Sequence, residues 1–326
     1  MQASCLKSPE AVVAGHICLD IIPTFEHSAA IEPGKLTKIG PAVISTGGAV
    51  SNTGLAMQRL GIRTRLIGKV GDDIFGRAIC EIAGSEGMIV AKGETSSYTV
   101  VINPPNVDRA FLHCPGANDT FRAADVTDAA LRGAKLFHFG YPPIMRRMFL
   151  DGGHELVSLF RRVKRLGLTT SLDMVMVDPK SEAGRVDWPA VLRRVLPYVD
   201  IFLPSLDEMQ VMIGNRPPAA IAAQLCDWGV GIAGLKLGHK GLYVRWPDRE
   251  RTVPCFKVKV VGTTGAGDAT IAGFLAAYLR GLPPDDVMTM AVAVGACCCE
   301  AADATSGIRP WNEVRRRIAA GWPRLK

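Results

Sequence analysis

The chain has 326 residues, of which 48% are hydrophobic and 21% charged, a composition typical of a globular rather than a disordered protein. Its longest apolar run, Val287 to Cys299, is shorter than the roughly 20 residues that a membrane-spanning helix needs. Met1 to Glu10 lacks the basic start and apolar core of a secretion signal, so we expect a soluble, cytoplasmic protein.

The net charge is +7, but the basic clusters Arg161–Arg165 and Arg315–Arg317 lie in helical patterns. They indicate solvated helix faces, so we expect no nucleic-acid and no membrane partner.

Nine cysteines are an odd number and follow no disulfide or metal-ligand spacing. Cys297, Cys298 and Cys299 are consecutive, so on a helix their side chains point in three directions and cannot converge on one ion. We interpret the cysteines as small, buried thiols in a reducing compartment.

Short apolar runs alternate with helical patterns along most of the chain. Strands are predicted at Ala11–Ile17, Arg65–Val70, Lys135–Phe139, Leu168–Leu172, Ile201–Leu203 and Gly231–Leu237. Helices are predicted at Asn52–Leu60, Phe75–Glu86, Gly153–Leu166, Trp188–Leu196 and Pro218–Trp228. Strand–helix–strand alternation predicts a mainly parallel α/β sheet with helices on both faces.

Two stretches interrupt this alternation. Leu36–Ser45 and Tyr98–His113 have strand patterns with no helix between strands, and a turn at Asn103–Asn106 divides the second. They predict a small antiparallel lid. The last third is helical, at Gly265–Arg280, Pro284–Ala302 and Trp311–Ala320. The whole chain, 1–326, is therefore predicted to be a single α/β domain with a discontinuous lid from about 18–45 and 96–116.

The segment most indicative of chemistry runs from Val258 to Phe274. A strand-like run ends in small residues, and a helix begins at Gly265-Ala266-Gly267, where unpaired backbone N–H groups and the positive end of the helix dipole favour an anion. Asp268 follows in the first turn, placed to accept a proton from a nucleophilic hydroxyl. The spacing matches neither a G-x-G-x-x-G dinucleotide fingerprint nor a G-x-x-x-x-G-K-[ST] phosphate loop. Taken alone, the segment also fits a tight turn with Asp268 as a helix-start charge.

A second glycine-rich segment, Gly47-Gly48-Ala49-Val50-Ser51-Asn52, precedes a predicted helix. Together the two segments resemble the N-terminal and C-terminal signatures of the ribokinase (PfkB) family of carbohydrate kinases. The resemblance implies a ribokinase-like fold and an ATP-dependent transfer of phosphate to a sugar hydroxyl. Gly265, Ala266 and Gly267 would form the anion hole and Asp268 would be the general base. Gly47, Gly48 and Asn52 would bind the sugar.

Weaker segments extend the resemblance over nearly the whole chain. Gly15–Asp20 resembles the opening strand with its sugar-binding aspartate, Asp20, and Pro115–Asn118 is similar to the segment that closes the lid, with Asn118 near the substrate. Asp200–Glu208 looks like the family's N-x-x-E stretch, which implies that Ser205 and Glu208 lie at the nucleotide and that Glu208 holds Mg²⁺ through water. Lys236, Gly238 and Gly241 fall in a stretch similar to a nucleotide-contacting strand and turn. Gly71–Gly76 is a family landmark that we interpret as structural.

Four residues depart from the family's pattern. Ser205 replaces the usual asparagine of N-x-x-E, while Ala49 and Gly140 occupy the places of a sugar-contacting lysine and glutamate in ribokinases proper. Ribose is therefore not the expected substrate. Gly262 replaces an aspartate that contributes to a K⁺ site in many relatives, so we expect little or no use of K⁺. The resemblance implies ATP and Mg²⁺ as cofactors.

Two alternatives to a sugar kinase stay open on the sequence alone. A nucleoside kinase of the same family would need an apolar base site, for which Phe25, Tyr98 and Phe111 are candidates near the lid. A non-catalytic sensor of sugar or nucleotide would keep the fold without the chemistry, a reading to which Ser205 lends some support. The resemblance also implies a homodimer formed through the lid.

Overall fold

The computed structural model describes residues 8–25, 33–105 and 110–325. Within these residues the main sheet has nine strands in the order β13-β12-β11-β10-β9-β8-β1-β4-β5. All neighbours from β11 to β5 are parallel, whereas β12 and β13 form an antiparallel edge. The strands are β1 (Ala11–Gly15), β4 (Thr64–Gly71), β5 (Met88–Ala91), β8 (Leu136–Gly140), β9 (Thr169–Asp173), β10 (Ile201–Phe202), β11 (Ile232–Lys236), β12 (Leu242–Arg245) and β13 (Glu250–Val253).

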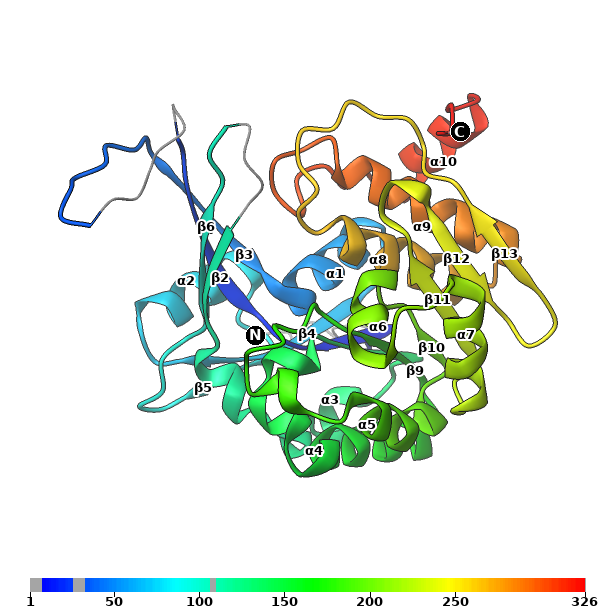
Figure 1. Cartoon of the computed structure of the whole chain (residues 1–326), viewed down its shortest axis with the longest axis horizontal. Helices are drawn as coiled ribbons and strands as arrows, with labels where there is room; N and C mark the ends of the chain where they lie inside the picture. Colours follow the sequence, from blue (N-terminus) through cyan, green and yellow to red (C-terminus); the bar gives the residue numbers. More distant parts are fainter. Residues whose placement is uncertain (1–7, 26–32, 106–109, 326) are drawn as a thin grey trace, which may run out of the picture.

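Helices cover both faces of this sheet, and each face has its own apolar core (Figure 1). One core contains residues of α1 (Gly48–Arg59), α2 (Ile74–Ala83), α8 (Ala266–Leu279), α9 (Pro284–Cys298) and α10 (Trp311–Ala319). The other contains residues of α3 (Asp128–Leu131), α4 (Arg146–Arg165), α5 (Trp188–Val195), α6 (Leu206–Ile213) and α7 (Pro218–Asp227). The predicted α/β class with helices on both faces is confirmed.

The longest apolar run forms most of α9, which is buried with α8 in the first core. Its apolar character therefore reflects burial between the sheet and its helices. Among the described residues, no helix combines the length and apolar character that crossing a membrane requires.

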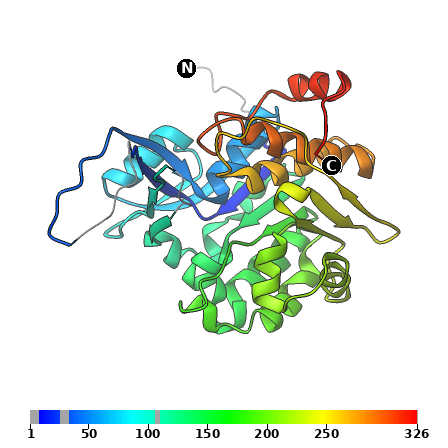
Figure 2. The same cartoon turned by 45° about the horizontal axis from the view of Figure 1, so that its top comes forward.

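A second sheet of four strands, β3-β2-β6-β7, stands beside the main sheet (Figures 1 and 2). Its strands are β2 (Cys18–Pro23), β3 (Ala42–Gly47), β6 (Tyr98–Ile102) and β7 (Ala110–Cys114). They come from the two stretches predicted to form the lid, although β2 and β6 pair in parallel rather than antiparallel. The lid stretches 26–32 and 106–109, including the end of the predicted turn, lie outside the described residues.

The strand-like run Val258–Val261 was wrongly predicted: it is irregular in the structure. The hairpin β12–β13, which the sequence did not predict, occupies the edge of the sheet beside β11 and leaves this run without a strand to pair with. The Val260 and Val261 side chains are exposed, and the N–H of Val261 instead bonds the carbonyl of Cys299. The apolar pattern of Val258–Val261 therefore belongs to a loop that precedes α8 and not to a strand.

Candidate active site

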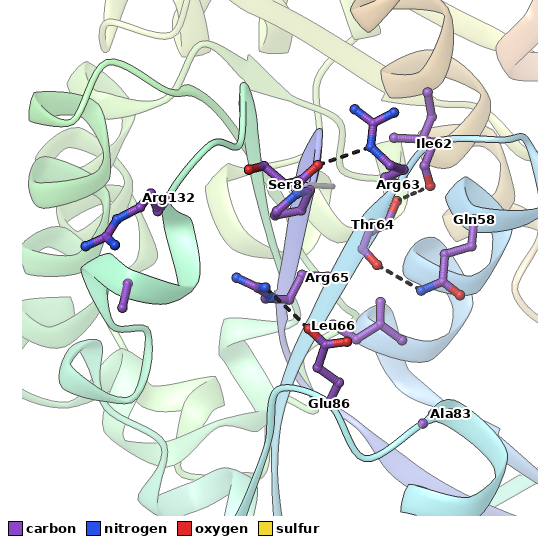
Figure 3. A pocket seen from close by; sticks show the side chains of 13 residues that line it. Ser8, Gln58, Ile62, Arg63, Thr64, Arg65, Leu66, Ala83, Glu86 and Arg132 are labelled. Atoms are coloured by element: carbon purple, nitrogen blue, oxygen red, sulfur yellow. Dashed lines mark hydrogen bonds and ion pairs between the residues drawn. The ribbon is translucent and has the colours of Figure 1, made fainter. Parts of the chain in front are cut away.

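Two of the cavities in the described part of the structure lie at opposite ends of the parallel strands. A cavity of about 720 Å³ lies at the amino end of β4. Figure 3 shows that two of its arginines are engaged: Arg65 pairs with Glu86 at 3.3 Å, and Arg63 donates to the Ser8 carbonyl at 3.1 Å. Open α/β sheets bind their ligands at the carboxyl ends of strands, so this cavity is not the candidate active site.

The other cavity, of about 450 Å³, opens at the carboxyl ends of β9 and β11 and at the start of α8. The residues predicted for catalysis and nucleotide binding all line it: Ser205, Glu208, Lys236, Gly238, Gly241, Gly265, Ala266, Gly267 and Asp268. Tyr141 and Asp173 also line it, although the sequence did not identify them as site residues. Segments separated by more than a hundred residues therefore meet at one cavity.

The start of α8 explains its small residues. Gly265 is the N-cap and has a left-handed backbone, φ 72°, which glycine adopts without steric cost. A Cβ at this position would lie 2.4 Å from the Cβ of Ala304, so a side chain has no room. The first N–H groups of a helix have no intrahelical partner, and the helix dipole is positive there. The turn thus presents backbone donors suited to phosphate oxygens.

Asp268 is almost fully buried and its carboxylate is held from three sides. Its Oδ2 accepts hydrogen bonds from Asn52 Nδ2 at 3.0 Å and from the Tyr141 hydroxyl at 2.7 Å. Thr53 donates to Oδ1 at 3.3 Å. The structure therefore brings the two predicted signatures into direct contact, because Asn52 and Thr53 lie on α1 and Asp268 lies on α8. A carboxylate fixed in this way can accept a proton from a hydroxyl that approaches it.

Lys236 and Asp173 form a buried ion pair beside this turn. Lys236 Nζ lies 2.8 Å from Asp173 Oδ1. It would also lie 3.4 Å from a Cβ placed on Gly267, so the ammonium stands next to the start of α8. Burial, with the nearby carboxylates of Glu208 and Asp268, raises the pKa of Asp173, while the Lys236 ammonium acts in the opposite direction. Burial also acts to lower the pKa of Lys236, but Asp173 and Glu208 outweigh it and the pKa is raised, so Lys236 is a cation.

Ser205 and Glu208 form a capping box at the start of α6. The Ser205 hydroxyl accepts from the Glu208 N–H at 3.2 Å, and Glu208 Oε2 accepts from the Ser205 N–H at 2.7 Å. Serine in place of the usual asparagine therefore caps the helix well. A carboxylate has several acceptor positions, so Glu208 keeps capacity for a further partner in the cavity that it lines.

Asp20, Gly47 and Gly48 lie together where the lid meets the main sheet. A Cβ on Gly47 would come within 2.3 Å of Asp20 Oδ2, and one on Gly48 within 2.5 Å of His16 Nδ1. Gly48 also has φ +85°. Both glycines are therefore required by close packing. Burial raises the pKa of Asp20 to about 6, although hydrogen bonds from Cys18 and Thr99 act in the opposite direction.

Buried polar atoms near these glycines have no hydrogen-bond partner within the described protein. They are both ring nitrogens of His16 and Oδ1 of Asn52. The His16 ring lies 6.0 Å from the Tyr141 ring, whose hydroxyl in turn reaches Asp268. Since buried polar groups are nearly always hydrogen-bonded, these atoms suit a ligand rich in hydroxyl groups.

Asn118, predicted to lie near the substrate, is fully buried and bonds the backbone of Ile17. Its Oδ1 accepts from the Ile17 N–H at 3.3 Å, and its Nδ2 donates to the Ile17 carbonyl at 2.8 Å. These bonds fix the connection between β1 and β2. A contact with substrate stays a prediction.

The chain is similar to several known proteins. The model of the pfkB family carbohydrate kinase matches residues 8–311. An uncharacterized sugar kinase of Archaeoglobus fulgidus is 31% identical over 78% of this chain and 98% of its own length. A 2-dehydro-3-deoxygluconokinase of Thermoproteus tenax is 28% identical, over 82% of this chain and 83% of its own. A rice fructokinase-2 is 26% identical, over 84% of this chain and 81% of its own length. The Arabidopsis thaliana ribokinase, solved with ribose and ATP, superposes with a TM-score of 0.79 at 20% identity, covering 95% of this chain and 98% of its own.

Proposed function

Because the chain belongs to the pfkB family of carbohydrate kinases it is a sugar kinase, and we propose that it transfers the γ-phosphoryl group of ATP to a hydroxyl of a sugar or sugar-like molecule. In this proposal Asp268 is the general base and Gly265 to Gly267 form the anion hole. The observation that supports it best is the contact of Asp268 with Asn52 across the two glycine-rich signatures. With this contact, a buried carboxylate would stand between the proposed nucleotide site and the proposed sugar site.

The chemistry follows from these positions. As the acceptor oxygen bonds to the γ-phosphorus and the bond to the leaving oxygen of ADP breaks, Asp268 takes the proton of the acceptor hydroxyl. Backbone N–H groups at the start of α8 and the Lys236 ammonium lie where charge on the transferring oxygens would be stabilised. On the acceptor side, Asp20, Asn52 and the backbone at Gly47 and Gly48 would bind sugar hydroxyls.

Mg²⁺ fits the acidic side of the cavity. Such phosphoryl transfers use Mg²⁺ to neutralise charge on the phosphates, and Mg²⁺ usually keeps several waters. Glu208, which lines the cavity and retains acceptor capacity, would hold it through water. Among the described residues, no three His, Cys, Asp or Glu side chains form a group that could hold a metal ion by themselves.

The proposal is tested by measuring ADP release with MgATP across a panel of acceptors. The panel contains hexoses, 2-dehydro-3-deoxygluconate, sugar phosphates, inositols and nucleosides. We expect a free sugar or sugar acid to be the best acceptor. Preference for a nucleoside would support the alternative kinase, and no turnover with any acceptor would support a sensor. The structure offers little support for a nucleoside kinase. The Tyr98 ring packs on the Phe75 ring with their centroids 5.1 Å apart, and the Phe111 side chain is largely exposed.

The acceptor KM is expected to rise as the pH falls from 7 to 5, while the ATP KM stays constant. The cause is Asp20, whose pKa is about 6. Above that pH the ionised carboxylate accepts strong hydrogen bonds from sugar hydroxyls, and below it the neutral acid accepts fewer and weaker ones. Asp20→Asn should raise the acceptor KM at pH 7.5 by roughly 10- to 100-fold, the loss of a hydrogen bond to a charged group, and should remove the pH dependence.

Asn52→Ala is the matched control for the Asp20 prediction. It should also raise the acceptor KM, because it removes an amide from the same site, but the pH dependence of KM should persist since Asp20 is intact. Steady-state kinetics with each substrate varied in turn give both values. If the pH dependence survives Asp20→Asn, Asp20 is not the titrating group.

Activation by K⁺ is expected to be weak or absent. Gly262 has no side-chain oxygen to offer, and a hard monovalent cation needs several oxygens to replace its hydration. A Cβ at this position would lie 2.8 Å from the Ala301 carbonyl oxygen and 3.0 Å from that of Ala302, so the backbone here leaves no room for an aspartate. The measurement compares kcat/KM in KCl and in tetramethylammonium chloride at equal ionic strength, since screening alone changes nucleotide affinity. A K⁺-specific increase of about tenfold or more would contradict the prediction.

A homodimer through the lid is the quaternary structure that we propose. Its support is the exposure of large apolar side chains on both edge strands of the lid sheet, Val43 and Ile44 on β3 and Phe111 and Leu112 on β7. Exposed apolar residues on the edge strands of a sheet favour pairing with another chain.

A further inference from the structure

Tyr141 has a backbone conformation that its residue type disfavours. It has φ 69° and ψ 41°, in the left-handed region, and among the described residues only Asp151 shares a positive φ without being glycine. A bulky residue there is strained, and such strain persists only where surrounding structure imposes it. The surroundings are visible: a Cβ on the preceding Gly140 would lie 2.1 Å from the Cβ of Ala49, and Pro142 follows.

The unusual backbone directs the Tyr141 side chain to the centre of the site. Its hydroxyl donates to Asp268 Oδ2 at 2.7 Å, the same oxygen that accepts from Asn52. The side chain lines the nucleotide cavity, while its ring lies 6.0 Å from that of His16 on the proposed acceptor side. The hydroxyl therefore stands where the two sites meet.

We propose that Tyr141 is a positioning residue for phosphoryl transfer, whose hydroxyl orients the Asp268 carboxylate and stabilises its ionised form. This inference rests on the proposed role of Asp268 as general base. A hydrogen bond donated to a carboxylate favours the charged form, which is the form able to take the acceptor's proton. Tyr141 itself keeps its proton throughout, and the proton released by the acceptor ends on Asp268.

The surroundings of Tyr141 keep it a donor. Burial, and then the negative charge of Asp268 and of Asp173, raise the pKa of the Tyr141 hydroxyl well above its usual value. The titratable and charged groups that face Asp268 and Tyr141 are Lys236 on β11, Asp173 on β9, Glu208 on α6, Cys298 on α9 and His16 after β1. Tyr141→Phe leaves all of them in place, so a comparison with the wild type isolates the hydroxyl.

The test measures kcat and kcat/KM against pH at saturating MgATP. The acceptor is D-fructose, or 2-dehydro-3-deoxygluconate if the panel shows it to be better. For Tyr141→Phe we expect kcat on the pH plateau to fall by about 3- to 30-fold with the ATP KM unchanged. On the acid side, where activity declines, the variant should lose roughly a further tenfold, because the ionised carboxylate has lost one donor. Unchanged thermal unfolding and ATP binding would show that the variant is folded.

Tyr243→Phe is the matched control, because the Tyr243 hydroxyl also donates to a carboxylate, that of Glu250 at 2.7 Å, on the β12–β13 hairpin. It should leave the pH profile where it is. If Tyr141→Phe has the same acid limb as the wild type while Asp268→Asn is inactive, the inference about Tyr141 is wrong and the proposed function stands. If Asp268→Asn stays active, the proposed function fails, and the inference fails with it.

Discussion

Asp268→Asn is expected to lower kcat by about 10²- to 10⁴-fold and to leave ATP binding nearly unchanged. The expected loss is that of a positioned general base. Asparagine has the same shape and keeps one oxygen that can accept from Asn52 or Tyr141, so the packing at the start of α8 should survive. Single-turnover measurements of ADP formation give the rate of the chemical step, and titration with a non-hydrolysable ATP analogue gives the affinity. A rate above about a third of the wild type, with chemistry limiting, would refute the assignment.

Asp73→Asn provides the control for that experiment. Asp73 is another carboxylate with several donors: Oδ1 accepts from Gly76 N–H at 2.8 Å and Ser96 hydroxyl at 2.6 Å, and Oδ2 from Ser96 N–H at 2.8 Å. These bonds cap α2 and tie it to the segment before β6, in the landmark interpreted as structural. The variant should therefore lose stability without a comparable loss of kcat. The contrast separates loss of a base from loss of a structural carboxylate.

The sheet and both glycine signatures could be predicted from the sequence because their signals are local. Buried parallel strands form continuous apolar runs, and a turn packed as tightly as Gly47–Gly48 or Gly265 tolerates only small residues. The hairpin β12–β13 was not predicted because its strands are short and carry charged residues such as Arg245 and Glu250. Such residues are common at sheet edges and mask the strand pattern.

The missed site residues depend on contacts between distant segments. The role of Tyr141 depends on its contacts with Asp268 and His16, which lie far from it in the sequence. Asp173 carried a usable signal, since it directly follows the strand predicted at Leu168–Leu172, and parallel sheets bind ligands at that end of their strands. Its pairing with Lys236 could not be predicted, because the two residues are 63 apart in sequence and meet only when β9, β10 and β11 are adjacent.

Lys236→Met is expected to lower both stability and kcat, and the two losses have different causes. The pair with Asp173 is buried, with side chains 12% and 1% exposed, so removal of the lysine leaves a carboxyl without its partner. Breaking a buried pair in this way typically costs about 3–5 kcal/mol of folding free energy. The loss of a cation beside the anion hole should separately lower kcat by about 10²- to 10³-fold. Urea unfolding measures the first effect and steady-state kinetics the second.

The double variant Lys236→Met/Asp173→Asn distinguishes the two roles. Replacing the carboxylate by a neutral amide removes the unpaired buried charge, so part of the lost stability should return, whereas kcat should stay low because no cation replaces Lys236. Lys164→Met is the control, since it breaks an ion pair with Asp200 that lies at the surface, where such pairs contribute only about 0–1 kcal/mol. It should change neither quantity appreciably. If the double variant regains wild-type kcat, Lys236 serves only to neutralise Asp173. The positive charge that acts on the transferring phosphoryl group must then come from the backbone at the start of α8 alone.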